Sequence, residues 1–67
     1  MHLTPFRLKL GIAAIAAEAD DLEARLGPRG AVRHIRAEIA RAGRYARPHL
    51  YRLHDEIARR HPAMMSA

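Results

Sequence analysis

The sequence contains no cysteine, and this absence removes the commonest cross-link available to a chain of only 67 residues. Without cysteine no disulfide can form, and a metal site would have to rely on histidine and carboxylate ligands. Hydrophobic cores of this size rarely supply more than about 3 to 5 kcal/mol. We therefore expect self-association or a partner protein to complete the fold.

Side chains that act as nucleophiles are equally scarce. The only aliphatic hydroxyls, Thr4 and Ser66, lie near the two ends of the chain. Five histidines are present, but none repeats at the H-x-x-x-H or H-E-x-x-H spacing of a helical metal site. The acidic residues that we interpret as a solvated flank of the first helix are Glu18, Asp20, Asp21 and Glu23. We predict a protein that is not an enzyme, with no catalytic residues, no metal site and no cofactor.

Long hydrophobic runs are also missing. A membrane-spanning helix needs about 20 mostly apolar residues, and the apolar run at residues 10–17 is much shorter. The A-x-A pattern at residues 17–19 resembles a signal-peptidase site, but cleavage there would cut through the heptad pattern described below. Because a chain without cysteine also suits a reducing compartment, we predict a soluble, cytoplasmic protein.

What the chain does contain is a heptad pattern of large apolar residues. In its first part they recur at alternating spacings of four and three, as on the face that one helix of a coiled coil presents to another. The same spacing resumes at Val32. The predicted packing interface consists of Leu8, Ile12, Ile15, Leu22, Leu26, Ile35 and Ile39.

Glycine and proline divide this pattern into helices. Gly27 followed by Pro28 predicts a helix end, because glycine can adopt a left-handed conformation and proline cannot continue the helix. Gly43 and Pro48 predict a second interruption, for which a break and a kink both remain open and a break or sharp kink is favoured. The predicted helices are 5–26, 31–43 and 48–60, followed by a flexible tail at 62–67.

These elements predict an all-α fold. The turn at residues 27–30 is short enough to bring the second helix back antiparallel to the first, as in a helical hairpin. We therefore expect residues 1–67 to form a single small domain, an antiparallel helical hairpin with a kinked or broken second arm and two to three helices. Oligomerisation or a partner would complete it.

Charge is distributed unevenly along the chain. Residues 1–28 hold three basic and four acidic residues, whereas residues 29–67 hold nine arginines and three acidic residues. On a continuous second helix, arginines would form a stripe opposite Ile35 and Ile39 that suits an anionic partner. The stripe consists of Arg33, Arg36, Arg41, Arg44 and Arg47. The alternative is a solvated face enriched by amino-acid usage, since the chain has eleven arginines and one lysine.

Residues 44–52 hold both tyrosines and three arginines around Pro48. Tyrosine and arginine are enriched at protein-binding hot spots, and aromatic rings among arginines can also stack on unpaired bases. In the alternative interpretation the tyrosines only cap the end of a thin core. The candidate hot-spot residues are Tyr45, His49, Tyr51 and Arg52.

Two functions follow from these patterns. The first is a small helical interaction protein that self-associates as a homodimer or higher oligomer, or docks as an accessory subunit on a larger protein, using the arginine-rich face. The second is a basic accessory protein that binds nucleic acid by contacting phosphates through the same stripe. We favour the first, because it explains the heptad pattern directly.

Overall fold

The computed structural model describes the backbone of residues 4–66 and the side chains of residues 11–65. The helices are α1 (Thr4–Arg41), α2 (Arg47–Arg60) and α3 (Pro62–Ser66), and residues 4–66 contain no strand. The predicted all-α class is confirmed.

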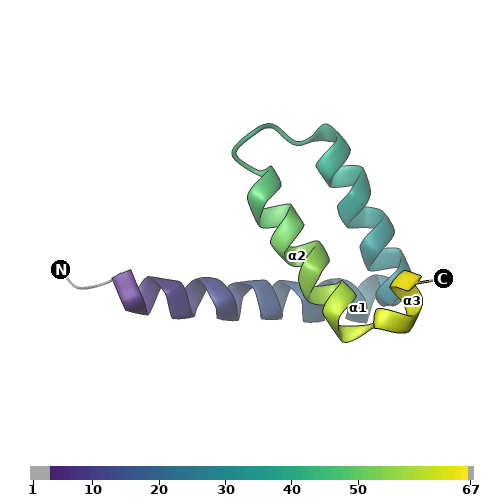
Figure 1. Ribbon diagram of the computed structural model, residues 1–67, viewed down its shortest axis with the longest axis horizontal. Coiled ribbons are helices and arrows are strands. Elements are labelled where there is room, and N and C mark those ends of the chain that lie inside the picture. The colour runs from purple at the N-terminus through teal and green to yellow at the C-terminus, as the bar shows by residue number, and fades with distance from the viewer. Residues whose placement is uncertain (1–3, 67) are drawn as a thin grey trace.

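The helix α1 consists of two straight arms joined at a single residue. Gly27 has φ 76° and ψ 164°, a combination that residues with a side chain rarely adopt. Pro28 then begins the next helical arm, where its missing N–H group is not needed. We call residues 4–26 the first arm and residues 28–41 the second arm; the second leaves the first at a steep angle (Figure 1).

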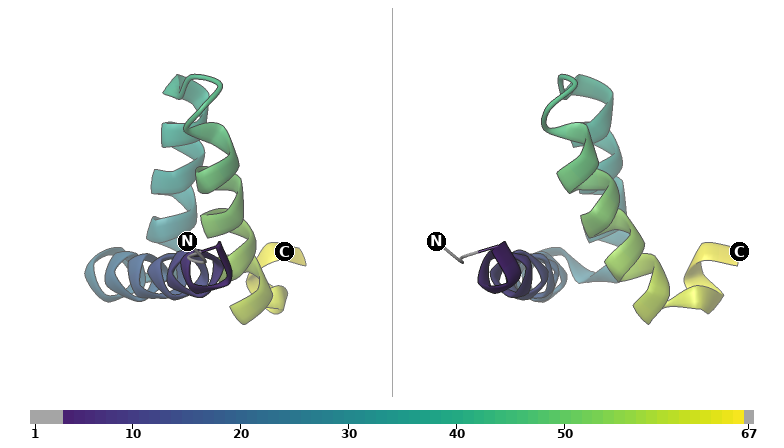
Figure 2. Two further views of the ribbon diagram at one scale, coloured as in Figure 1. Left: turned by 90° about the vertical axis from the view of Figure 1, so that its left-hand side faces the viewer. Right: turned by 60° about the vertical axis from the view of Figure 1, so that its left-hand side comes forward.

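The second interruption is a break. Residues 42–46 are not helical, and α2 begins at Arg47 with Pro48 in its first turn. The backbone N–H groups of Ala46 and Arg47 both donate to the carbonyl oxygen of Gly43, at 3.2 and 3.3 Å. This tight turn sends α2 back beside the second arm (Figures 1 and 2). We call these two helices the helix pair, and residues 42–47 its tip.

The antiparallel neighbours are therefore the second arm and α2. The hairpin predicted between the first two helices, with its turn at residues 27–30, is not confirmed, because the first arm crosses the base of the helix pair instead (Figure 1). The physical reason lies in the length of the connection. A helical hairpin needs a loop of about two to five residues, whereas only Gly27 departs from helical geometry here.

The hydrophobic core lies where the first arm, the second arm and α2 meet. Its three largest fully buried side chains are Ile35, Leu53 and Ile57. Ala19 and Ala31 are also fully buried and allow the helices to approach closely. The core consists of Ala19, Leu22, Ala31, Val32, Ile35, Leu53 and Ile57, with Ile15, Ile39, Leu50, Met64 and Met65 packed against it.

Residues 62–66, which the sequence predicts as a flexible tail, form the short helix α3. The backbone N–H groups of Met64 and Met65 donate to the carbonyl oxygen of His61 at 3.1 and 3.3 Å. Both side chains pack against the core. The unbranched thioether side chain of methionine adapts to irregular surfaces, so α3 can cover an end of a thin core that would otherwise face water. Residue 67 lies outside the described residues.

Candidate functional site

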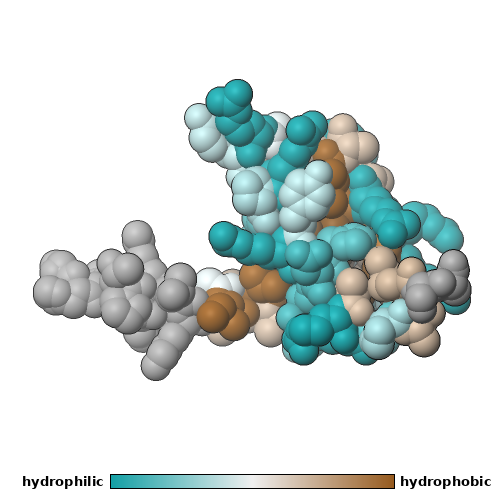
Figure 3. All heavy atoms as spheres, viewed as in Figure 1, coloured by the Kyte–Doolittle hydropathy of each residue, from teal (hydrophilic) through white to brown (hydrophobic). Residues whose placement is uncertain are grey.

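The predicted packing interface divides into a covered and an uncovered part. Leu22 and Ile35 are buried and Ile15 and Ile39 are partly buried, but Ile12 is 68% exposed. Because the helix pair crosses the first arm near the kink, it covers only that end of the arm (Figure 1). Hydrophobic side chains are open to solvent on the rest of its described surface (Figure 3).

Leu26 and Leu8 are the remaining members of the predicted packing interface. Leu26 is 45% exposed beside the kink, where it lines a shallow hollow together with Met64. The side chain of Leu8 lies outside the described residues. Ile12 therefore lies on the same heptad face as the buried Leu22, but beyond the part of that face that the helix pair covers.

A polar network joins the C-terminal end of α2 to the first arm. Arg60 donates from Nε to Glu56 at 2.9 Å within α2. Its Nη1 lies 2.8 Å from Asp20 and 3.1 Å from Glu23, both on the first arm. The Nε2 atom of His61 lies 2.8 Å from the second carboxylate oxygen of Glu23. These contacts attach the base of the helix pair to the first arm.

Two ionisable groups of this network have shifted pKa values. Hydrogen bonds from Arg59 and then Arg60 hold the pKa of Glu56 below its ordinary value. The hydrogen bond to Glu56 raises the pKa of Arg60, because it favours the charged guanidinium. Both shifts favour a carboxylate and a guanidinium that stay charged around neutral pH.

The acidic cluster that the sequence predicts as a solvated flank is exposed at Glu18 and Asp20, but Glu23 is only 17% exposed, and all three side chains contact basic side chains of α2 or its C-terminal end. Asp20 and Glu23 bind Arg60, and Glu18 lies 2.8 Å from Nε2 of His49 near the start of α2. Asp21 pairs with Arg25 on its own helix. The sequence did contain a signal for these contacts between helices, because residues 1–28 have a net negative charge and residues 29–67 a net positive one.

All seven aspartate and glutamate side chains of the chain have a basic side chain within 4 Å. Within helices these partners are i,i+3 or i,i+4 neighbours, except for the adjacent residues His54 and Asp55, and between helices they are the contacts described above. Asp55 has the longest contact, 3.8 Å to His54. The seven are Glu18, Asp20, Asp21, Glu23, Glu38, Asp55 and Glu56.

Six arginines differ from the other described ones in having no carboxylate of the described side chains within 4 Å. All six are exposed. They are Arg29, Arg33, Arg36, Arg44, Arg47 and Arg52. The excess positive charge of the chain is therefore carried by the helix pair.

The structure separates the predicted arginine stripe into two groups. Because the second arm ends at Arg41, Arg44 lies in the break and Arg47 begins another helix. Arg41 pairs with Glu38. The other members of the predicted stripe, Arg33 and Arg36, stay on the second arm. Together with Arg29, which was not part of the predicted stripe, they line a hollow of about 430 Å³ with Val32, Met64 and Met65, and we call these three the arm arginines.

The predicted hot spot surrounds the tip of the helix pair. Tyr45 is 90% exposed and Tyr51 is 52% exposed, so neither ring is part of the core. His49 differs from them because its ring contacts Glu18 on the first arm. We define the tip cluster as Arg44, Tyr45, Arg47, Tyr51 and Arg52.

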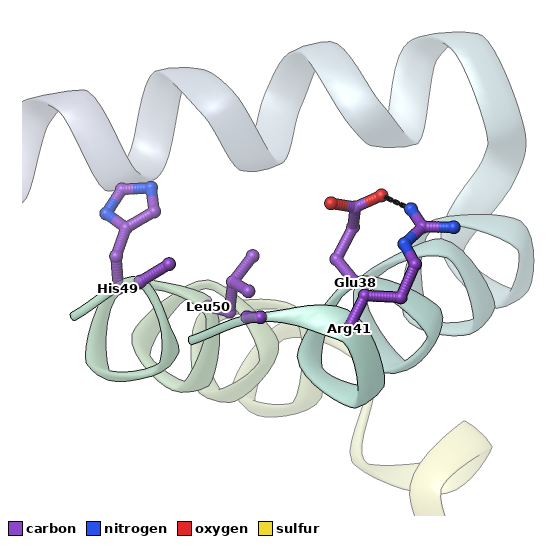
Figure 4. Close-up of a pocket in the computed structure, with 6 residues that line it drawn as sticks. Glu38, Arg41, His49 and Leu50 are labelled. Atoms are coloured by element: carbon purple, nitrogen blue, oxygen red, sulfur yellow. Dashed lines mark hydrogen bonds and ion pairs between the residues drawn. The ribbon is translucent and has the colours of Figure 1, made fainter. Parts of the chain in front are cut away.

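A hollow of about 440 Å³ lies on the inner side of the tip. Ala42, Ala46 and Leu50 provide its apolar lining. His49 and the Glu38–Arg41 ion pair flank it and point toward the first arm (Figure 4). The hollow therefore faces the space between the tip and the first arm.

Across the described side chains, no group of three histidine or acidic residues is placed to hold a metal ion. None of the helices at residues 4–66 combines the length and apolar character needed to cross a bilayer.

The chain was also compared with known proteins. No protein family, curated protein or solved structure matches it.

Proposed function

We propose that the chain is a self-associating helical interaction module whose first arm packs against the first arm of a second copy. The observation that carries this proposal is the 68% exposure of Ile12. This residue continues the heptad pattern that is buried at Leu22. Burying a large aliphatic side chain contributes about 1.5 to 3 kcal/mol, so water is an unfavourable environment for this face.

A second copy supplies a surface of matching chemistry. Two first arms packed antiparallel about a two-fold axis would, by heptad position, bring Ile12 of one copy level with Leu8 of the other. The same pairing would occur twice, because each copy contributes the same face. The hollow beside Leu50 supports this arrangement, since it leaves space next to the first arm for side chains of the partner.

The charge pattern of the first arm favours the antiparallel arrangement. Basic residues, Arg7 and Lys9, precede the free apolar face in the sequence, and acidic residues follow it from Glu18 onwards. An antiparallel pair therefore brings ends of opposite charge closer together. A parallel pair would place like charges level with one another, which is unfavourable.

The experiment is size exclusion coupled to light scattering over a range of concentrations, with the variant Ile12→Asp. We expect the unmodified chain to form a dimer and the variant to be monomeric. The helical signal in circular dichroism should be retained, because Ile12 lies outside the core. Ala40→Asp is the matched control, since it places the same acid at an exposed position of the second arm.

Three results would contradict the proposal. The first is an unmodified chain that stays monomeric at every concentration. The second is an Ile12→Asp variant that remains dimeric, which would assign the contact to a different surface. Dissociation of both Ile12→Asp and Ala40→Asp would also argue against a contact through the first arm.

A further inference from the structure

We infer that the tip cluster binds single-stranded nucleic acid, with its arginines contacting phosphates and its two tyrosines stacking on bases. The cluster occupies residues 44–52, in the break and the first turns of α2. It is independent of the exposed apolar face of the first arm, on which the proposed self-association rests.

The tip cluster carries positive charge that the fold leaves available. The three arginines of the tip cluster are exposed and have no described carboxylate within 4 Å. Six of the seven acidic side chains of a second copy lie within 3.1 Å of a basic side chain and could neutralise the tip only by giving up these contacts; Asp55, 83% exposed and 3.8 Å from His54, is the exception. The tip therefore suits an external anion, and guanidinium groups match phosphate geometrically through paired hydrogen bonds.

The tip cluster also contains two aromatic rings. Tyr45 and Tyr51 are two of the three aromatic residues of the chain, and both rings face solvent. Neither stabilises the core. Successive bases stack on exposed aromatic side chains beside a positively charged surface, and this stacking tolerates any base because every base has a flat face.

The backbone also determines where these side chains lie. Arg47 and Tyr51 are four residues apart on α2 and so lie on the same side of that helix. Arg44 and Tyr45 belong to the preceding turn, which the Arg47 N–H group closes by donating to the carbonyl oxygen of Gly43 at 3.3 Å. The backbone thus holds charged and aromatic side chains together at one end of the helix pair.

Other kinds of partner fit the tip less well. A protein hot spot has a desolvated apolar centre, and a membrane-binding surface needs apolar side chains to insert. The other large apolar side chains that the structure describes as exposed, Ile12 and Leu26, are both on the first arm. A nucleic-acid duplex offers phosphates, but its paired bases are not free to stack on tyrosine. A single strand offers both.

The intrinsic fluorescence of the chain provides a direct test. The sequence has no tryptophan, so its fluorescence comes from Tyr45 and Tyr51. The unmodified chain is titrated with an oligothymidylate of about 12 nucleotides, a length within the range that single-strand binding sites cover. We expect tyrosine emission to be quenched on binding and the affinity to fall steeply with salt, because phosphate contacts release counterions.

Two double variants, each of which removes two positive charges, then locate the site. The double variant Arg44→Gln, Arg47→Gln should bind at least about tenfold more weakly. The matched control is Arg25→Gln, Arg59→Gln, which changes the net charge equally but removes arginines that are already paired with Asp21 and Glu56. The control should bind within about twofold of the unmodified chain if local contacts decide the affinity.

Two further variants, one in the tip cluster and one on the first arm, sharpen the assignment. Tyr45→Ala should weaken binding by about fivefold or more, since it removes one stacking surface. It should leave the fold intact, because the ring is almost fully exposed. The Ile12→Asp variant should bind with unchanged affinity per chain, which separates this site from the proposed self-association.

Several outcomes would overturn the inference. Equal losses of affinity in the two double arginine variants would indicate that binding depends only on the overall positive charge. Binding without quenching, or equal affinity for a duplex of the same length, would exclude stacking at the tip. Binding of polyglutamate as tight as that of the oligonucleotide would point to an acidic protein partner. Loss of binding in the variant Arg33→Gln, Arg36→Gln alone would assign the site to the arm arginines.

Discussion

The two ends of α2 carry arginine in similar numbers but in different surroundings. At the C-terminal end, Arg59 and Arg60 are bound by Glu56 and by acidic side chains of the first arm. Toward the N-terminal end, Arg47 and Arg52 have no described carboxylate within 4 Å. The difference arises because Glu56 lies beside both C-terminal arginines and the first arm adds Asp20 and Glu23, whereas near the start of α2 the first arm offers only Glu18, which contacts His49 and not an arginine. An arginine-rich sequence therefore contains both structural and available arginines, and only their surroundings distinguish them.

The largest effect is expected where the base of the helix pair enters the core. Ile57 is fully buried, so Ile57→Ala should lower the free energy of unfolding by about 2 to 5 kcal/mol. Leu50 lies nearer the tip and is only partly buried. Urea denaturation of Ile57→Ala and Leu50→Ala measures the contrast. A larger loss for Leu50→Ala would show that the tip, and not the base, holds the fold.

A smaller loss of unfolding free energy is expected for a substitution at Gly27, the kink that places the first arm across the base of the helix pair. Gly27 has open space around its Cα, so only its backbone conformation opposes a side chain. Gly27→Ala should cost about 1 to 3 kcal/mol, the range for a residue held in a region that favours glycine. Thermal unfolding measures this cost, with Gly11→Ala, also unobstructed, as the helical control. A stabilised Gly27→Ala variant would contradict the kinked geometry.

The next prediction concerns the charged network itself. Arg60→Gln removes the contacts to Asp20, Glu23 and Glu56, but this side chain is 25% exposed and solvent screens part of its interaction. We expect a loss of about 1 kcal/mol. Arg52→Gln, which has no described ion pair to lose, should change stability by less than about 0.5 kcal/mol. Equal effects of the two variants would remove the distinction between structural and available arginines.

The same network predicts a dependence on pH. Hydrogen bonds from Arg59 and Arg60 lower the pKa of Glu56 from an ordinary value of 4.5. The folded state therefore gains stability from this carboxylate above about pH 4.5, and loses it as the pH falls through the lowered value. Thermal midpoints across this range should fall less steeply for Glu56→Gln. A profile identical to that of the unmodified chain would exclude Glu56 as a contributor.

The smallest effect on stability is expected at the tip. Because the Tyr45 ring is 90% exposed, Tyr45→Ala should change the free energy of unfolding by less than about 0.5 kcal/mol. Thermal unfolding checks this. A loss above 1 kcal/mol, well beyond the usual range for an exposed site, would mean that the ring has a structural role and would weaken the contrast between tip and base.

The helix boundaries were largely predictable because their signals are local. Gly27 and Pro28 interrupt the helix as expected, and residues 42–46 form a break within the predicted region. The end of α2 before Pro62 also agrees with the prediction. Capping, left-handed glycine and the missing N–H of proline depend on the few residues beside them, so sequence reasoning can detect them.

The candidate site was only partly predictable. Residue type alone identified the exposed residues Tyr45 and Tyr51 and the arginines around them. It did not show that the ring of His49 contacts Glu18 on the first arm. The pairing of Asp20 and Glu23 with Arg60 joins residues nearly forty positions apart. Spacing within one helix carries no signal for such contacts, since they depend on how two helices cross.

The sequence by itself determined that the chain is helical, where its helices are interrupted, and that the excess positive charge lies after Gly27. The tertiary structure decided the steep angle at Gly27, the folding of α3 onto the core and the separation of paired from unpaired arginines. The physical reason is the range of the interactions. Helix formation is governed by neighbours within about four residues, whereas crossing angles and ion pairs between helices depend on side chains that meet only after the chain has folded.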